Sequence, residues 1–90
     1  MPAYLYVYPD LARHGVVEHD ALDATTERHA LLVRPPREVS RGDALTALAA
    51  QPQLDGVVLQ LARGFLDRAQ LTFAANVLRT RRRLWVYWPV

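Results

Sequence analysis

Two β-rich apolar runs flanking an amphipathic stretch constrain this chain most. Residues 57–61 are apolar at all positions except Gln60, and residues 84–88 are aromatic or aliphatic throughout. Between them, Ala62-Arg63-Gly64 breaks the first run, and the residues from Phe65 to about Arg83 follow a helical period. A strand, a helix and a strand in this order form a right-handed crossover with parallel strands. We therefore expect segments 57–61 and 84–88 to run parallel in one sheet.

The amphipathic stretch has distinct faces when it is plotted at about 100° per residue. One broad face is apolar and holds Leu66, Ala69, Phe73, Ala74, Val77 and Leu78. The opposite face is polar and holds Arg68, Thr72, Asn76, Arg79 and Arg83. Gln70 falls within the apolar face, either as a partly buried amide at its rim or as part of a subunit contact.

The N-terminal segment 3–8 alternates strictly and predicts a strand that ends at Pro9-Asp10. Its period of two places Tyr4, Tyr6 and Tyr8 on one face, opposite Leu5 and Val7. The tyrosines either pack under a helix with their hydroxyls reaching water, or form an exposed aromatic stripe used for association.

Residues 11–28 carry weaker signals, namely a short strand at Val16-Val17 and one or two helical turns over 20–27. The histidines of the chain are His14, His19 and His29. The spacing of His14 and His19 fits neither one helix face nor one strand face, and no zinc-type spacing is present. We therefore expect no metal site.

Residues 29–34 predict a second strand, because Pro35-Pro36 cannot continue a ladder. Ser40 is placed to cap a helix, with Asp43 near its positive end. That helix is expected from Ala44 to about Gln51, where Pro52 stops it.

These elements predict a small α/β domain with a mainly parallel four-stranded sheet and two helices, in the order β-β-α-β-α-β. The sequence does not decide whether the first strand runs parallel or antiparallel to the others. Ninety residues leave no room for a second domain. We divide the domain into an acidic leader with the first strand (1–28) and a β-α-β-α-β body (29–90).

Charge is divided along the chain. Residues 1–27 hold one arginine and five carboxylates, whereas residues 28–90 hold ten arginines and four carboxylates. An acidic leader beside a basic body can fold back on that body or pair with another copy.

Composition excludes several classes of protein. The chain has no cysteine, which removes disulfides, thiolate metal sites and thiol nucleophiles. Its N-terminus lacks the pattern of a signal peptide, and no apolar run approaches the ~20 residues that span a bilayer. We expect a cytoplasmic protein that makes no membrane contact and carries no cofactor.

The body has the hydrophobic pattern of a known repeat. The residues concerned are segments 30–33, 43–50, 54–61 and 84–87, with the arginine-tipped helix between the last two. Residues 29–88 resemble one repeat of the crotonase and Clp-protease superfamily, closest to signal peptide peptidases of the serine/lysine type.

The resemblance implies the fold but not the activity. These peptidases need a glycine-rich turn after the strand, which here is Ala62-Arg63-Gly64-Phe65, and they need a serine and a lysine. This chain has a single serine, Ser40, and no lysine. The resemblance therefore implies a non-catalytic relative, or a half that joins a partner.

We expect a non-enzymatic assembly or adaptor module that forms homo-oligomers or docks on a protein partner through its aromatic strands. The last strand is apolar or aromatic on both faces, so neither face is expected to be freely solvated. The predicted interface residues are Tyr4, Tyr6, Tyr8, Trp85, Tyr87 and Trp88.

The alternative is a small anion- or nucleic-acid-binding protein. Ligands of open parallel sheets bind beyond the carboxyl ends of the strands, where Arg34, Arg37 and Arg63 are expected beside a helix N-terminus. Clustered arginines with aromatics also fit nucleic acid, although arginines at a helix C-terminus complement its dipole as well. That cluster is Arg79, Arg81, Arg82 and Arg83.

Overall fold

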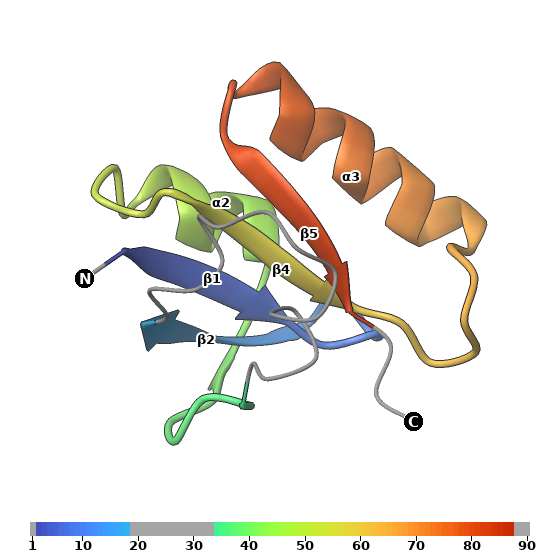
Figure 1. Cartoon of the computed structure of the whole chain (residues 1–90), viewed down its shortest axis with the longest axis horizontal. Helices are drawn as coiled ribbons and strands as arrows, with labels where there is room; N and C mark the ends of the chain where they lie inside the picture. The colour runs from blue at the N-terminus through green and yellow to red at the C-terminus, as the bar shows by residue number, and fades with distance from the viewer. Residues whose placement is uncertain (1, 19–33, 88–90) are drawn as a thin grey trace.

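The computed structural model describes residues 2–18 and 34–87, which form a five-stranded sheet with two helices (Figure 1). The order in the sheet is β3-β2-β1-β4-β5. The strands are β1 (Ala3–Val7), β2 (Arg13–Glu18), β3 (Ser40–Arg41), β4 (Gly56–Gln60) and β5 (Arg83–Tyr87). The helices are α2 (Ala44–Ala49) and α3 (Arg68–Arg79).

The predicted crossover is confirmed. β4 and β5 are parallel neighbours, with Val58 beside Trp85, and α3 joins them. β1 also runs parallel to β4 on its other side, with Tyr6 beside Val58. β4 is therefore the central strand of a parallel unit, and β5 lies at one edge of the sheet (Figure 1).

The prediction of a mainly parallel four-stranded sheet is wrong. β2 pairs antiparallel with β1, and β3 pairs antiparallel with β2, so the sheet is mixed. The cause is a hairpin after β1, in which the Tyr8 N–H donates to the Arg13 carbonyl and Leu11 adopts a positive φ of 61°. Asp10 holds this turn by accepting from the backbone of Ala12 and pairing with the Arg13 guanidinium at 2.8 Å.

The other N-terminal predictions have separate outcomes. Val16 and Val17 do lie in a strand, but β2 is longer than predicted. Residues 29–33 of the predicted strand 29–34 lie outside the described residues. Arg34, the last residue of that predicted strand, is described and is not in a strand. The predicted turns over 20–27 also lie outside the described residues.

The first helix begins at Ala44 as predicted, whereas α3 begins at Arg68 rather than at Phe65. Asp43, not Ser40, caps α2, because its side chain accepts from the Thr46 N–H, while Ser40 lies in β3. Asp67 caps α3 in a capping box with Gln70. A carboxylate one residue before a helix satisfies N–H groups that the first turn leaves open, and this sets both start points.

The two sheet faces carry different cores. On one face, α2 and α3 cover aliphatic residues of β1 and β4. The other face is aromatic, with Tyr4, Tyr6, Val17 and Val58 buried and Tyr8, Trp85 and Tyr87 packed against them. Alternation along each strand produces this division, since odd and even positions point to opposite faces. The helix-side core residues are Leu5, Val7, Ala44, Leu48, Leu54, Val57, Leu59, Phe73 and Val77.

Candidate docking edge and arginine sites

Tyr4 and Tyr6 are fully buried within the single chain, with 0% of each side chain exposed. The Tyr6 hydroxyl donates to Oε1 of Gln60, and burial raises its pKa far above the ordinary tyrosine value. The Tyr6 ring also packs edge-on against Tyr8, with ring centroids 5.2 Å apart. The prediction that Tyr4 and Tyr6 form an exposed interface is therefore wrong, because both tyrosines belong to the core.

The remaining predicted interface residues lie nearer the surface. Tyr8, Trp85 and Tyr87 are half-buried on the same face, and Trp88 lies outside the described residues. The indole Nε1 of Trp85 is buried and has no hydrogen-bond partner among the described residues. Of the predicted interface residues, Trp85 and Tyr87 thus lie on β5 at the sheet edge, and Tyr8 lies just after β1.

The backbone of β5 has one open side. The Arg83 N–H donates to the Asp55 carbonyl, and the Tyr87 carbonyl accepts from the Leu61 N–H, so both residues face β4. In a parallel ladder the residues that face a neighbour alternate along the strand. Leu84 and Val86 therefore direct their N–H and C=O groups away from β4. In the part of the chain that the structure describes, no strand lies on that side of β5.

An exposed apolar stripe on α3 adjoins this edge. Leu71 and Leu78 are 54% and 57% exposed, whereas Phe73 and Val77 are buried. At about 100° per residue, the two leucines lie roughly 100° past the centre of the buried face. Crossovers of this kind are right-handed, so the chain moves outward from β4 through α3 to β5. A rotation of about 100° around the axis of α3 therefore directs the two leucine side chains beyond the outer edge of β5. Leu71, Leu78 and the 42%-exposed Val86 therefore form one apolar surface, which we call the β5 edge surface.

The sequence-based interpretation of α3 missed this surface. It placed Leu78 on the buried face and assigned Leu71 to neither face. The buried arc is narrower than the apolar pattern suggests, because α3 lies over the edge of the sheet and has no strand beneath its outer side. Gln70 donates to the Gln60 carbonyl within the chain, which favours the interpretation as an amide over a subunit contact, although Gln70 is fully rather than partly buried. Two leucines seven residues apart on one helix side were the signal for the exposed stripe.

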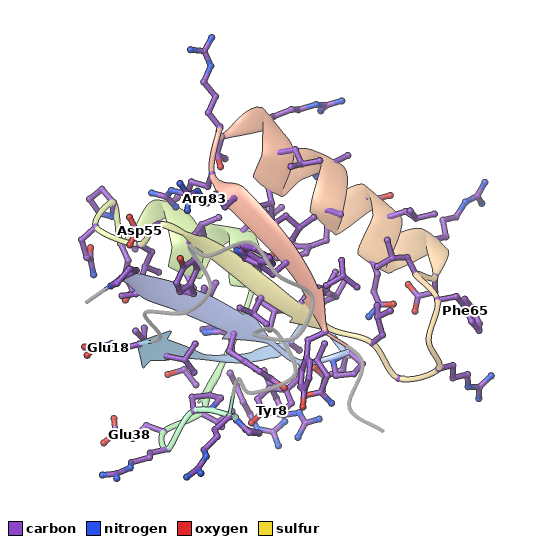
Figure 2. The ribbon with its side chains drawn as sticks, viewed as in Figure 1. Tyr8, Glu18, Glu38, Asp55, Phe65 and Arg83 are labelled. Atoms are coloured by element: carbon purple, nitrogen blue, oxygen red, sulfur yellow. The ribbon has the colours of Figure 1, made fainter. Side chains whose placement is uncertain are left out.

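Arg34 and Arg37 line a groove of about 970 Å³ along β2. Buried His14 lies in the same groove, and neither arginine makes an ion pair with a described carboxylate. Two carboxylates, Glu18 and Glu38, also border it and extend outward (Figure 2). The groove therefore carries both signs of charge.

Arg63 lies elsewhere, so the three arginines predicted to share an anion site do not meet. It lines a separate hollow of about 380 Å³ with Asp10, Asp67 and Gln70. Phe65, in the same loop, is exposed and points away from the ribbon (Figure 2). The prediction failed because the described neighbours of β4 are β1 and β5, and Arg34 belongs to neither strand.

The four arginines predicted to bind nucleic acid gather at the turn between α3 and β5. Arg82 donates to the Leu48 carbonyl at 2.8 Å, and Arg79 reaches Oδ1 of Asn76 at 3.5 Å. Arg81 is exposed and has a positive φ of 62°. Arg83 begins β5 at the end of the sheet that also holds Asp55 (Figure 2). At least one of the four, Arg82, is thus occupied inside the chain.

The described ranges 2–18 and 34–87 hold neither a cluster of metal ligands nor a membrane-spanning helix. They contain no group of three potential metal ligands among His, Cys, Asp and Glu. His14 lies in β2, while His19 and His29 are outside those ranges. Within the same ranges, no helix has the length and apolarity needed to cross a membrane.

Comparison with protein-family models, with curated proteins and with solved structures gave no match. Function is therefore inferred from the geometry of the chain itself.

Proposed function

We propose that this chain is a non-enzymatic assembly module that self-associates through the β5 edge surface. The observation that carries the proposal is that no described strand pairs with the outer side of β5, where Leu84 and Val86 face outward next to exposed leucines of α3. Edge strands in monomers are normally shortened, charged or bulged, because an open edge invites pairing with another chain. The outward positions of β5 have none of these protections.

The opposite edge of the sheet provides a contrast. β3 has two residues, Ser40 and Arg41, both exposed, and Gly42 follows it with a φ of 141°. A short, charged edge strand of this kind resists pairing. The difference between the two edges favours β5 as the docking side of the molecule.

Light scattering after size-exclusion chromatography tests the proposal. We expect the mass of the wild-type chain to exceed the 10.2 kDa of one copy as concentration rises. Val86→Lys places a charge on the edge and should return the chain to one copy. Val39→Lys is the matched control, since Val39 is 46% exposed but lies away from β5, and it should leave the mass unchanged. A wild-type mass of one copy at every concentration would refute the proposal.

A second candidate function, binding of a phosphate-bearing ligand or nucleic acid, is favoured by the meeting of Arg34 and Arg37 with His14 in one groove. Fluorescence anisotropy of a labelled single-stranded oligonucleotide at about 50 mM salt tests it. Arg34→Ala with Arg37→Ala removes the groove cations, whereas Arg79→Ala with Arg81→Ala removes those at the turn. No binding by the wild-type chain would exclude this candidate.

The resemblance to the crotonase and Clp-protease superfamily stays a prediction about the fold. It adds no activity to either candidate, because the chain has one serine and no lysine.

A further inference from the structure

We propose that the partner of β5 is a second copy of this chain, related by a twofold axis beside Trp85. The two β5 strands then pair antiparallel, and the two α3 helices pack side by side across the same axis. This inference rests on the proposed self-association and specifies its geometry.

The backbone of β5 fits this arrangement. With the axis at Trp85, the two Trp85 residues lie opposite each other at a non-hydrogen-bonded position, because their N–H and C=O groups face β4. Leu84 of each copy then meets Val86 of the other at a hydrogen-bonded position, where the pair exchanges two N–H···O=C bonds. This is the register that pairs both outward residues within the bounds of the strand.

The helices fit the same axis. The midpoint of Leu71 and Leu78 lies about 7 Å before Arg79, at a rise of about 1.5 Å per residue. Trp85 lies about 7 Å after Arg83, at about 3.3 Å per residue. α3 and β5 run in opposite directions from one turn (Figure 1), so these two lengths place the midpoints at about the same height. One twofold axis can therefore relate the two β5 strands and also the two α3 helices.

The contact would be apolar on the helix side of the sheet. Leu84 and Val86 lie beside Val57 and Leu59, whose side chains point into the helix-side core. Leu71 of each copy faces Leu78 of the other above them. Burying these side chains removes apolar area that a single chain leaves in water, which is the main driving force for association.

Charge favours the antiparallel arrangement. α3 begins after Asp67 and ends in the turn that holds Arg79, Arg81 and Arg82. Antiparallel packing brings the start of each helix, where Asp67 and Arg68 carry opposite charges, near the arginine turn of the other copy, and it opposes the two helix dipoles. A parallel arrangement would bring the two arginine turns together, where like charges repel.

Single cysteines give a clean test, because the chain has none of its own. Ala75 is exposed on α3 and lies next to the proposed axis. Under mild oxidation, Ala75→Cys should form a covalent dimer. Ala49→Cys is the matched control, since Ala49 is also an exposed helical alanine but lies on α2, and it should stay a single chain on a non-reducing gel.

A second cross-link makes the test independent of one position. In the double variant Leu71→Cys/Leu78→Cys, the proposed axis predicts a disulfide from position 71 of one copy to position 78 of the other, which mass spectrometry of the digest identifies. Val86→Lys should raise the dimer dissociation constant at least about tenfold, because it introduces an unpaired charge at the strand contact.

The outcomes separate this inference from the proposed function. A wild-type chain that remains one copy by light scattering overturns both. A wild-type dimer that Val86→Lys weakens overturns this inference alone if neither cysteine variant cross-links. A wild-type dimer whose dissociation constant is unchanged by Val86→Lys overturns both, because the proposed function places the contact on the β5 edge surface. Open-ended oligomers would also overturn it, because a twofold contact closes at two copies.

Discussion

Arg82 donates from Nη1 to the backbone carbonyl of Leu48 over 2.8 Å, which joins the turn after α3 to the last turn of α2. The Leu48 carbonyl also accepts from the Gln51 N–H at 3.2 Å, so Arg82 is its second donor, and a cationic donor at a helix C-terminus complements the dipole. The neighbouring Arg81 is exposed. Two adjacent arginines of one cluster therefore have different surroundings.

Arg82→Ala should lower the free energy of unfolding by about 1 kcal/mol, because it removes a charge-assisted hydrogen bond between two elements. Arg81→Ala should change it by less than about 0.5 kcal/mol, as expected for an exposed position. Urea denaturation of both variants measures the difference. Equal losses in the two variants would contradict the structural role given to Arg82.

Gln70→Ala should cost about 2 kcal/mol of stability, since the Gln70 side chain accepts from the Asp67 N–H and donates to the Gln60 carbonyl while only 2% exposed. The loss removes half of a capping box and a bond from α3 to the residue that ends β4. Gln53→Ala, at an exposed position, is the control and should be nearly neutral. Thermal and urea denaturation report both variants, and a neutral Gln70→Ala would show that this amide is dispensable.

Stability should fall at alkaline pH because of Tyr6. Burial raises the pKa of Tyr6 above its ordinary 10.0, so the folded state keeps this proton where the unfolded state has released it. The stabilisation is complete below the unfolded pKa and is lost as pH rises above it, by up to about 1.4 kcal/mol per pH unit.

Tyr6→Phe should flatten this alkaline decline and cost about 1 kcal/mol near neutral pH, because the Gln60 amide loses its donor. Urea denaturation between pH 8 and pH 11 measures both effects. Tyr8→Phe is the control and should retain the decline. The assignment to Tyr6 fails if the slope of Tyr6→Phe matches that of the wild-type chain.

Gly15→Ala should destabilise the fold by about 2 kcal/mol, since a Cβ at this position would overlap the Glu38 carbonyl oxygen and the Pro36 ring. The backbone after Pro36 would have to move away from β2. Val16→Ala, on the same strand but at an exposed side chain, should stay within about 0.5 kcal/mol of the wild type. Urea denaturation compares the two, and a neutral Gly15→Ala would mean that segment 34–38 moves without cost.

Local pattern predicted part of the docking edge. The apolar character of residues 84–87 was evident from the sequence, and so was their place at the end of a crossover. That Trp85 and Tyr87 share a face followed from the strand period. However, the sequence could not identify the open side of β5, because an edge is defined by the strand that is missing beside it.

The predicted arginine sites depended even more on which strands are neighbours in the sheet. Arg34 and Arg37 lie three residues apart and remain together in one groove. Arg63 was added to them on the assumption that its strand lies beside theirs, and strand adjacency depends on contacts between distant residues. The tyrosines of β1 had two interpretations for a similar reason, since an alternating pattern does not say what covers each face.

The sequence by itself determined the unit from β4 through α3 to β5, because the strand and helix periods and the break at Ala62-Arg63-Gly64 are local properties. It also supplied the carboxylates that cap both helices, although Ser40 was predicted as the first cap and the second helix was expected to begin at Phe65. Only the tertiary structure decided that β1 lies between β2 and β4, that Tyr4 and Tyr6 are core residues, and that Leu71 and Leu78 are exposed. These outcomes depend on which distant segments pack together, and side-chain periodicity along one segment carries no record of its neighbours in space.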